Sequence, residues 1–264
     1  MTKQEIFEYL SKVLPYFHED FCDENRDEYI DTPLRRTWLP FEYSIESGIT
    51  KTVILIKGAN FVVKIPFTCW YDEDSFDDEL NDWHHQIEEL STIQEKEAFF
   101  LNNPEPCCAD ERWFYEFSGA YCDNLNEEFS GSDYCHLETA IYRQAVEEGL
   151  GAYFAEEGTL GDINNTTIYY QTRCTPVSSL NIDYNSQEYE KKNKLSKELC
   201  RKLEIDCFHP VWIADFVEHY GAAELKRLHS FLMFYEIGDL RPCNIGYLDG
   251  APILFDYSGY REWD

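Results

Sequence analysis

The stretch from Tyr235 to Gly259 constrains the fold of this chain more than any other part of the sequence. It reads YEIGDLRPCNIGYLDGAPILFDYSG and contains two short apolar runs, Ile245–Leu248 and Pro252–Phe255, joined by Asp249-Gly250. The Asp-Gly dipeptide is typical of a two-residue hairpin turn, because both residues tolerate the positive φ that such a turn requires. We therefore predict a loop, then a β-hairpin, and then an aspartate (Asp256) at the exit of the hairpin.

The same stretch holds three polar side chains in a fixed order. Asn244 follows Asp239 by five residues, and Asp256 follows Asn244 by twelve. Phosphoryl transfer uses a carboxylate that orients or deprotonates the acceptor, together with an amide and a second carboxylate that hold Mg²⁺ on the phosphates. Asp239 is the candidate for the first role, and Asn244 and Asp256 are the candidates for the metal. The alternative is an acidic hairpin that matches this pattern by chance.

A resemblance to a known family rests on these residues. The run Asp239-Leu-Arg-Pro-Cys-Asn244 resembles the protein-kinase catalytic loop (HRD-L-x-x-x-N), and Asp256-Tyr-Ser-Gly259 resembles a DFG-type magnesium motif. Ile237 and Gly238 stand where the His-Arg pair usually lies. The amino-acid sequence of the whole stretch resembles that of small kinase-like proteins encoded by phages and prophage-type elements. This resemblance implies a two-lobed, protein-kinase-like α+β fold that uses ATP and Mg²⁺.

The charge of the chain limits its partners. The 264 residues carry 51 acids against 22 bases, a formal net charge of −29, and 44% of the residues are hydrophobic. The apolar content argues against disorder, and the length suits one two-lobed domain. An acidic surface repels nucleic-acid phosphate, so we expect no direct nucleic-acid binding; it would suit a basic protein partner. An acidic mimic of DNA is a further alternative, and the oligomeric state stays open.

Ten cysteines show no C-x-x-C pair and no Cys/His spacing of a zinc site. The chain has no secretory start and no long apolar run, so we expect no membrane segment. Free thiols in a reducing cytosol are the simplest account of the cysteines, and they favour a cytoplasmic protein.

The expected organisation is a single kinase-like domain over residues 1–264. It begins with a helical extension at 1–40, in which residues 3–16 form an amphipathic helix, and continues with an N-lobe at 41–173. The N-lobe contains a long acidic insert at 68–131 that includes an amphipathic helix. A reduced helical C-lobe follows at 174–264, with helices expected at 185–203 and 212–236.

Lys64 is the candidate for the phosphate-binding lysine. Residues 41–67 read as three strands, at 41–45, 51–57 and 60–66, and Lys64 interrupts the strongly apolar third one. Burying an ammonium group is costly without a paired anion or phosphate, so a function explains it economically. The resemblance is to the third-strand V-A-I-K motif, whose lysine reaches the α/β phosphates. The alternatives are Lys57 in this role, or an edge-strand lysine that points to water.

Glu138 is the candidate for the partner of that lysine. Residues 132–156 resemble the helix that supplies a glutamate to the lysine, and Glu138 lies beside the stripe of Leu137, Ile141 and Ala145. Glu88 or Glu89 on the acidic insert is the alternative, and a solvated helix glutamate is another.

Other nucleotide contacts are implied by the resemblance alone. Gly48 lies in the first turn, which would cover the ATP phosphates, and it is the single glycine there. The β-rich run Thr167–Arg173 should lead into the hinge between the lobes, so Tyr170, Gln171 and Thr172 are the expected adenine contacts.

Eight residues follow Asp256, so we expect no activation segment and no peptide-docking lobe of the protein-kinase type. The leading hypothesis is a Mg-ATP-dependent phosphotransferase with an unknown acceptor; nucleotidyl transfer would use the same metal ligands. A pseudokinase-like interaction module is the alternative, because the His-Arg pair and the activation segment are missing, the glycine-rich loop is poor, and the chain has an acidic insert.

Overall fold

The computed structural model describes residues 1–12, 29–31, 36–38, 41–47, 51–66, 73–103, 124–125, 134–163 and 166–257. They divide into two compact units. The first comprises residues 1–120, 129–135 and 158–171, and the second comprises residues 121–128, 136–157 and 172–264. Gly48 and the Ser258-Gly259 part of the magnesium motif lie outside the described residues, as do residues 13–16 of the predicted N-terminal helix.

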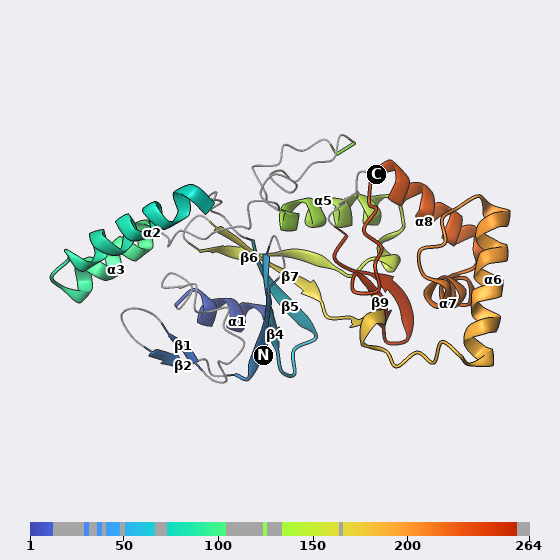
Figure 1. The fold of residues 1–264 in the computed structure, drawn as a ribbon, viewed down its shortest axis with the longest axis horizontal. Coiled ribbons are helices and arrows are strands. Elements are labelled where there is room, and N and C mark those ends of the chain that lie inside the picture. Colours follow the sequence, from blue (N-terminus) through green and yellow to red (C-terminus); the bar gives the residue numbers. More distant parts are fainter. Residues whose placement is uncertain are drawn as a thin grey trace. The chain divides into compact units, whose positions relative to one another are not determined.

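The first unit is built on a five-stranded sheet (Figure 1) with the order β3-β4-β5-β7-β6. Its strands are β3 (Tyr43–Ser47), β4 (Lys51–Ile56), β5 (Phe61–Pro66), β6 (Glu157–Ile163) and β7 (Thr166–Thr172). The first three form antiparallel pairs, in which Ile45 lies opposite Ile54 and Val53 opposite Lys64. The three strands predicted for residues 41–67 and the strand predicted at Thr167–Arg173 are therefore confirmed. β6 was not predicted.

Helix α1 (Lys3–Leu10) covers the core of this sheet. It begins at a capping box, in which the Thr2 hydroxyl accepts a hydrogen bond from the Glu5 amide and Glu5 caps Thr2 in return. Ile6 and Leu10, one helical turn apart, are fully buried against residues of β4, β5, β6 and β7. The predicted N-terminal amphipathic helix thus packs on the body of the first unit.

Two acidic helices and a short hairpin complete the described part of the first unit. The hairpin pairs β1 (Tyr29–Asp31) with β2 (Arg36–Trp38). In α2 (Glu73–Glu88), Trp83 and Ile87 are buried, and Phe99 of α3 (Ile93–Asn102) packs against them. The helix predicted within residues 68–131 is therefore present, and two of its apolar residues, Trp83 and Ile87, pack against Phe99 of α3.

The second unit is mainly helical. Its helices are α5 (Tyr134–Glu147, whose first two residues belong to the first unit), α6 (Gln187–Leu203), α7 (Pro210–Tyr220) and α8 (Ala222–Phe234), with short 3-10 turns at Gly151–Tyr153 and Val177–Ser179. α7 lies at the centre, in contact with α6, α8 and β10. Its Trp212 and Phe216 are fully buried, so this apolar helix forms the core of the unit.

A small sheet of order β10-β9-β8 carries the predicted hairpin. β9 (Ile245–Leu248) and β10 (Ala251–Leu254) are antiparallel, and the two-residue strand β8 (Thr175–Pro176) adds to β9. At the level of class the chain is thus a mixed α+β protein, as expected. Among the described residues, no helix combines the length and the apolarity that a bilayer crossing demands.

Candidate functional site

The loop that carries Asp239 begins where α8 ends. Glu236 takes a left-handed backbone conformation (φ 56°), and the next amide, that of Ile237, bonds to the Leu232 carbonyl at 2.8 Å. Such a bond from beyond the last helical residue is a common way to end a helix and reverse the chain. Ile237 is buried, so an apolar anchor precedes Asp239 where the resembling family has its His-Arg pair.

Asp239 and Asn244 are bonded to each other. The Asn244 Nδ2 group donates to the Asp239 backbone carbonyl at 3.0 Å and to Asp239 Oδ2 at 2.8 Å. Asn244 is buried, and its own amide N–H donates to the Arg241 carbonyl at 2.8 Å. Because both Nδ2 bonds run to Asp239, the side chain presents its Oδ1 on the opposite side of the amide.

Arg241 binds both carboxylate oxygens of Asp239. Its Nε donates to Oδ1 at 2.5 Å, and its Nη2 donates to Oδ2 at 2.6 Å. A bidentate pair of this kind fixes the plane of the carboxylate as well as its position. The side chain of Asp239 is 20% exposed and that of Arg241 is 65% exposed, so the pair lies at the surface of the unit.

The hairpin returns the chain to Asn244. Asp249 and Gly250 form its turn with φ values of 51° and 84°, as the Asp-Gly dipeptide predicted. At the other end, the Phe255 amide donates to the Asn244 carbonyl at 3.0 Å. Asp256 follows directly, in a left-handed conformation (φ 52°) and partly exposed. Residues twelve apart in sequence are thereby neighbours in space.

The charges of this cluster also affect the pKa of Cys243. Cys243 is an exposed residue, and the partial burial of its thiol raises its pKa; the Arg241 guanidinium opposes this rise, and the carboxylates of Asp239 and Asp256 add to it. Both carboxylates therefore act on the same neighbour. The structure brings together Asp239, Asn244 and Asp256, the three residues that the spacing predicted.

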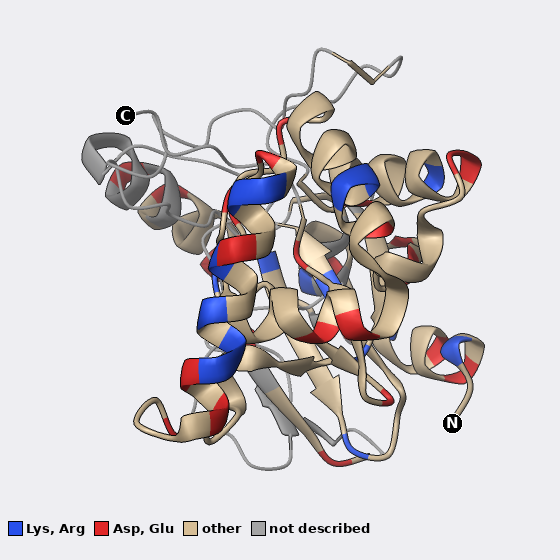
Figure 2. Cartoon of the chain, turned by 90° about the vertical axis from the view of Figure 1, so that its right-hand side faces the viewer, with Lys and Arg blue, Asp and Glu red and all other residues tan. Residues whose placement is uncertain are grey.

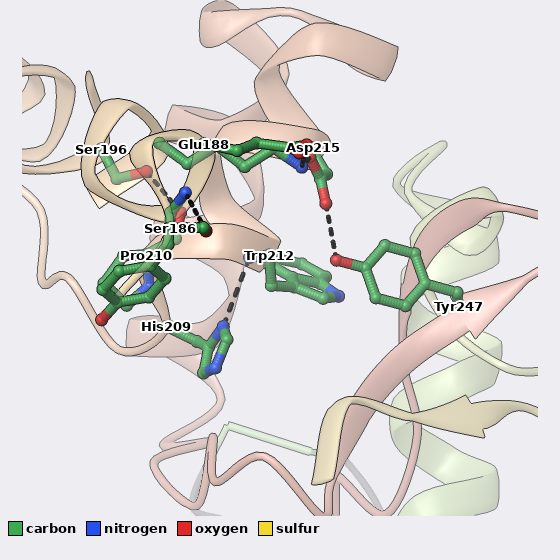
Figure 3. Close-up of polar contacts among 10 residues, drawn as sticks. Ser186, Glu188, Ser196, His209, Pro210, Trp212, Asp215 and Tyr247 are labelled. Atoms are coloured by element: carbon green, nitrogen blue, oxygen red, sulfur yellow. Dashed lines mark hydrogen bonds and ion pairs between the residues drawn. The ribbon is translucent and has the colours of Figure 1, made fainter. Parts of the chain in front are cut away.

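Two hydrogen bonds hold the hairpin on α7. The indole N–H of Trp212 donates to the Gly246 carbonyl at 2.9 Å. The Tyr247 hydroxyl donates to Asp215 Oδ2 at 2.7 Å (Figure 3). Lys192 of α6 pairs with the other oxygen of Asp215 at 2.6 Å. Burial and the bond to Asp215 raise the pKa of Tyr247, which keeps the hydroxyl a donor.

The exit of the hairpin is fixed as well. The hydroxyl of Tyr257, a buried residue, donates to the Ala155 carbonyl at 2.8 Å, and the Ala155 amide donates to the Leu254 carbonyl at 2.7 Å. Asp256 lies between these two attachments, so its backbone is held from both sides.

The remaining predicted residues lie outside this loop and hairpin. Lys64 is on β5 of the first unit, an interior strand, and is 3% exposed, which excludes the edge-strand lysine in water. Glu138 lies on α5 and is 0% exposed, so it is not a solvated glutamate. The alternatives are at the surface: Lys57 pairs with Glu42, and Glu88 and Glu89 are exposed.

Tyr170 and Gln171 are the last residues of β7 that belong to the first unit. Thr172, the final residue of this strand, belongs to the second unit. Gln171 is buried. Because Lys64, Tyr170 and Gln171 belong to a different unit from Asp239, their convergence on one cleft stays a prediction.

Two features of the site were not predicted. The motif assigns no role to Arg241, although a guanidinium two residues from a carboxylate in a tight loop is a signal for a pair. The link between Tyr247 and Asp215 joins residues 32 apart and has no local signal.

Within the part of the chain that the structure describes, no group of three or more His, Cys, Asp or Glu side chains could hold a metal ion by itself. No family model, no curated protein and no solved structure matches this chain.

Proposed function

We propose that this protein is a Mg-ATP-dependent phosphotransferase of the protein-kinase-like superfamily, similar to small kinase-like proteins of phages and prophage-type elements. One observation carries the proposal. Asp239 and Asn244 are hydrogen-bonded in one loop, and a hairpin that begins at Asn244 delivers Asp256 next to it. This is the order and the neighbourhood that an acceptor-orienting carboxylate and two metal ligands require.

The donor atoms fit Mg²⁺. The Asn244 amide is oriented with its Nδ2 on Asp239, which leaves a neutral oxygen for a cation, and Asp256 supplies a carboxylate. Mg²⁺ prefers oxygen ligands and is usually bound by one or two protein groups together with substrate phosphates and water. A site with two protein ligands therefore agrees with the lack of a larger His/Cys/Asp/Glu group among the described residues. When bound, the ion would neutralise phosphate charge.

Two buried ionisable residues support the two-lobed interpretation. Lys64 lies on the third of three consecutive antiparallel strands, as in the V-A-I-K motif, and Glu138 lies on α5, in the part of that helix that belongs to the second unit. Both ionisable side chains are buried, and burial of a charged group is costly unless it is paired or binds a ligand. In this proposal residues 41–173 form the N-lobe, α2 and α3 belong to its acidic insert, and residues 170–172 form the hinge.

Each residue then has a physical role. Asp239 would orient the acceptor hydroxyl and accept its proton at a carboxylate oxygen, while Asn244 fixes the rotamer of that carboxylate through its Nδ2 bond. Arg241 occupies both oxygens of Asp239, so an acceptor has to share or displace this guanidinium. Lys64 and Glu138 would position the phosphates. Positioning and charge stabilisation are most of what such an enzyme contributes.

The test uses two aspartates of the same backbone type. Asp256 and Asp249 both have left-handed backbones, with φ values of 52° and 51°, and asparagine tolerates that conformation. Asp256→Asn and Asp249→Asn therefore each remove one carboxylate with little backbone cost. ATP should raise the melting temperature of the parent and of Asp249→Asn more with Mg²⁺ than without it. In Asp256→Asn the Mg²⁺-dependent part should be lost. An unchanged response in Asp256→Asn would refute the assignment.

Transfer is tested by ADP release from Mg-ATP with small-molecule hydroxyl acceptors, folded basic proteins and short peptides, with Asp239→Asn as the inactive control. ADP release by the parent with one of these acceptors, and none by Asp239→Asn, would support the proposal. No ADP release by the parent with any acceptor would contradict it.

A pseudokinase-like interaction module is the second candidate, and the Arg241–Asp239 pair favours it. Both oxygens of the proposed base are already bound by a guanidinium, and an apolar Ile237 precedes it. In that case Mg-ATP would stabilise the fold without any ADP release. A basic protein partner would then bind the acidic surface, with an affinity that falls steeply as salt increases.

A further inference from the structure

A pocket lies along one face of α8 within the second unit. Lys226, Ser230 and Phe234 follow one another at intervals of four residues, so they form one row along the helix. Leu203 at the end of α6 and Leu150 beyond the end of α5 also line the pocket. Its volume is about 840 Å³, and small-molecule sites span roughly 300–1,000 Å³. None of the candidate catalytic or metal-binding residues is among the described residues that line it.

Much of the lining is apolar. Leu150, Phe231 and Tyr235 are buried, so one side of the pocket belongs to the core of the unit. Phe234 is 55% exposed, which is unusual for a phenylalanine. A hydrocarbon group in the pocket would remove part of this ring from water, which is favourable. The pocket therefore suits a ligand with an apolar body.

Two charged side chains of the lining are already held by the protein, and a third is not. Arg227 donates from Nη1 to Glu224 Oε2 at 2.6 Å and from Nη2 to the Glu148 carbonyl at 3.1 Å. The Tyr235 hydroxyl donates to Glu148 Oε1 at 3.0 Å. The exposed ammonium group of Lys226 has no ion pair with any residue that the structure describes. It is therefore available to pair with an anionic group of a ligand.

Positive charge gathers around the pocket in an otherwise acidic chain. Arg201 and Lys202 directly precede Leu203 of the lining. Among the described lining residues, Lys226 and Arg227 are basic and Glu148 is the single acid. Because the chain has 51 acids and 22 bases, most of its surface repels an anion, whereas this part attracts one.

We propose that the pocket binds one molecule of an amphipathic carboxylate, such as a fatty acid of medium chain length. The carboxylate pairs with the Lys226 ammonium, and the hydrocarbon chain lies on the apolar lining, where it covers the Phe234 ring. A single ligand fits this site better than a membrane surface does, because Leu150 and Phe231 line a hollow instead of an exposed apolar face. This site does not depend on the proposed phosphoryl transfer.

Isothermal titration calorimetry of the full chain with decanoate, below its critical micelle concentration, tests the proposal. We expect one decanoate to bind per chain, more tightly than 1-decanol, which has the hydrocarbon chain but no charge. Lys226→Gln should weaken decanoate binding roughly fivefold, as expected for an exposed ion pair, and should leave 1-decanol binding unchanged. Lys194→Gln is the matched control, because Lys194 is an exposed lysine of α6 outside the lining; this variant should bind both ligands as the parent does.

Two further variants test the position of the site. Ser230→Trp places a large ring in the pocket from an exposed position, and it should prevent the binding of both ligands. Ala223→Trp fills the same pocket from another exposed position, which covers the case that Ser230→Trp fails to fold by circular dichroism. The proposal is overturned by an absence of decanoate binding to the parent, by binding of many decanoate molecules per chain, or by binding that survives in a folded tryptophan variant. Equal losses of decanoate and 1-decanol affinity in Lys226→Gln would also overturn it.

Discussion

Gly246 has no room for a side chain. A Cβ atom at this position would lie 2.2 Å from the carbonyl oxygen of Thr175 and 2.9 Å from the Phe255 ring. The oxygen belongs to the backbone of β8, which pairs with β9 at this point, so it cannot move aside as the end of a flexible side chain could. The glycine therefore permits the close approach that anchors the hairpin.

We predict that Gly246→Ala lowers the free energy of unfolding by about 3 kcal/mol, because the overpacked contact forces two strands apart. Urea unfolding followed by circular dichroism measures the change. Gly250→Asn is the control: this residue has a left-handed backbone (φ 84°) and open space around it, and asparagine tolerates both. An equal loss in the two variants would show that steric contact with Thr175 is not the cause.

At the scale of elements, α7 begins with a titratable cap. His209 precedes Pro210, and its Nδ1 accepts a hydrogen bond from the Trp212 amide at 3.3 Å (Figure 3). A histidine can cap a helix in this way only while that nitrogen is unprotonated. Burial lowers the pKa of His209, and the Asp215 carboxylate opposes the shift in part.

The start of α7 should consequently weaken in mild acid. Because the folded pKa lies below the ordinary value of 6.5, the unfolded chain takes up the proton first as the pH falls. The stability contributed by His209 is complete above that value, and it is lost as the pH falls towards the folded pKa, by at most about 1.4 kcal/mol per pH unit. His209→Asn keeps a capping acceptor without titrating, so its free energy of unfolding should decline less between pH 7 and pH 5 than that of the parent. Parallel curves would contradict this role.

The attachment of β9 to α7 is a second prediction at this scale. Tyr247→Phe removes the hydroxyl that donates to Asp215, and it should cost about 1–2 kcal/mol because a partly buried carboxylate loses a partner. Lys192 remains on the other carboxylate oxygen and limits the loss. A double-mutant cycle with Asp215→Asn isolates the coupling between the two side chains. Additive effects would mean that the bond does not hold the hairpin.

At the scale of the whole molecule, charge is unevenly distributed. The chain carries 51 acids and 22 bases, yet six of those bases lie on α6 (Lys191, Lys192, Lys194, Lys197, Arg201 and Lys202; Lys and Arg are blue in Figure 2). Two of the six lie in the last turn of the helix, where positive charge interacts favourably with the helix dipole. The rest of the chain is correspondingly more acidic, and its like charges repel one another.

Screening should therefore stabilise the fold. We predict that the melting temperature rises as sodium chloride is added between low and physiological ionic strength, because the Debye length falls to about 8 Å there. Differential scanning calorimetry over a salt series measures this. A parallel series with a neutral osmolyte separates charge screening from general exclusion. A falling melting temperature would mean that attractive pairs outweigh the net charge.

Local chemistry was sufficient to predict several elements. The positive φ of Asp249 and Gly250 follows from the dipeptide itself, and the strands β4 and β5 follow from their apolar runs. The predicted neighbourhood of Asp239, Asn244 and Asp256 also follows, because a hairpin of fixed length brings its two ends together. This is the part of the site that sequence determines.

Elements that depend on distant partners could not be predicted in this way. β6 reads EGTLGDI, with two glycines and few apolar residues, and it forms by pairing with β7. β8 has two residues and exists through its contact with β9, some seventy residues later. The Arg241–Asp239 pair and the Tyr247–Asp215 bond likewise depend on how the backbone places the side chains.

The indole of Trp212 gives the hairpin an optical reporter. It is fully buried in contact with the rings of Phe208 and Phe216, and its N–H is bonded to the hairpin itself at Gly246. If the hairpin leaves α7, water reaches the indole, and its emission shifts to longer wavelength. The chain has six tryptophans, so a variant that retains Trp212 alone would make this emission specific. Stopped-flow fluorescence of that variant would then time the motion of the segment that carries Asp256.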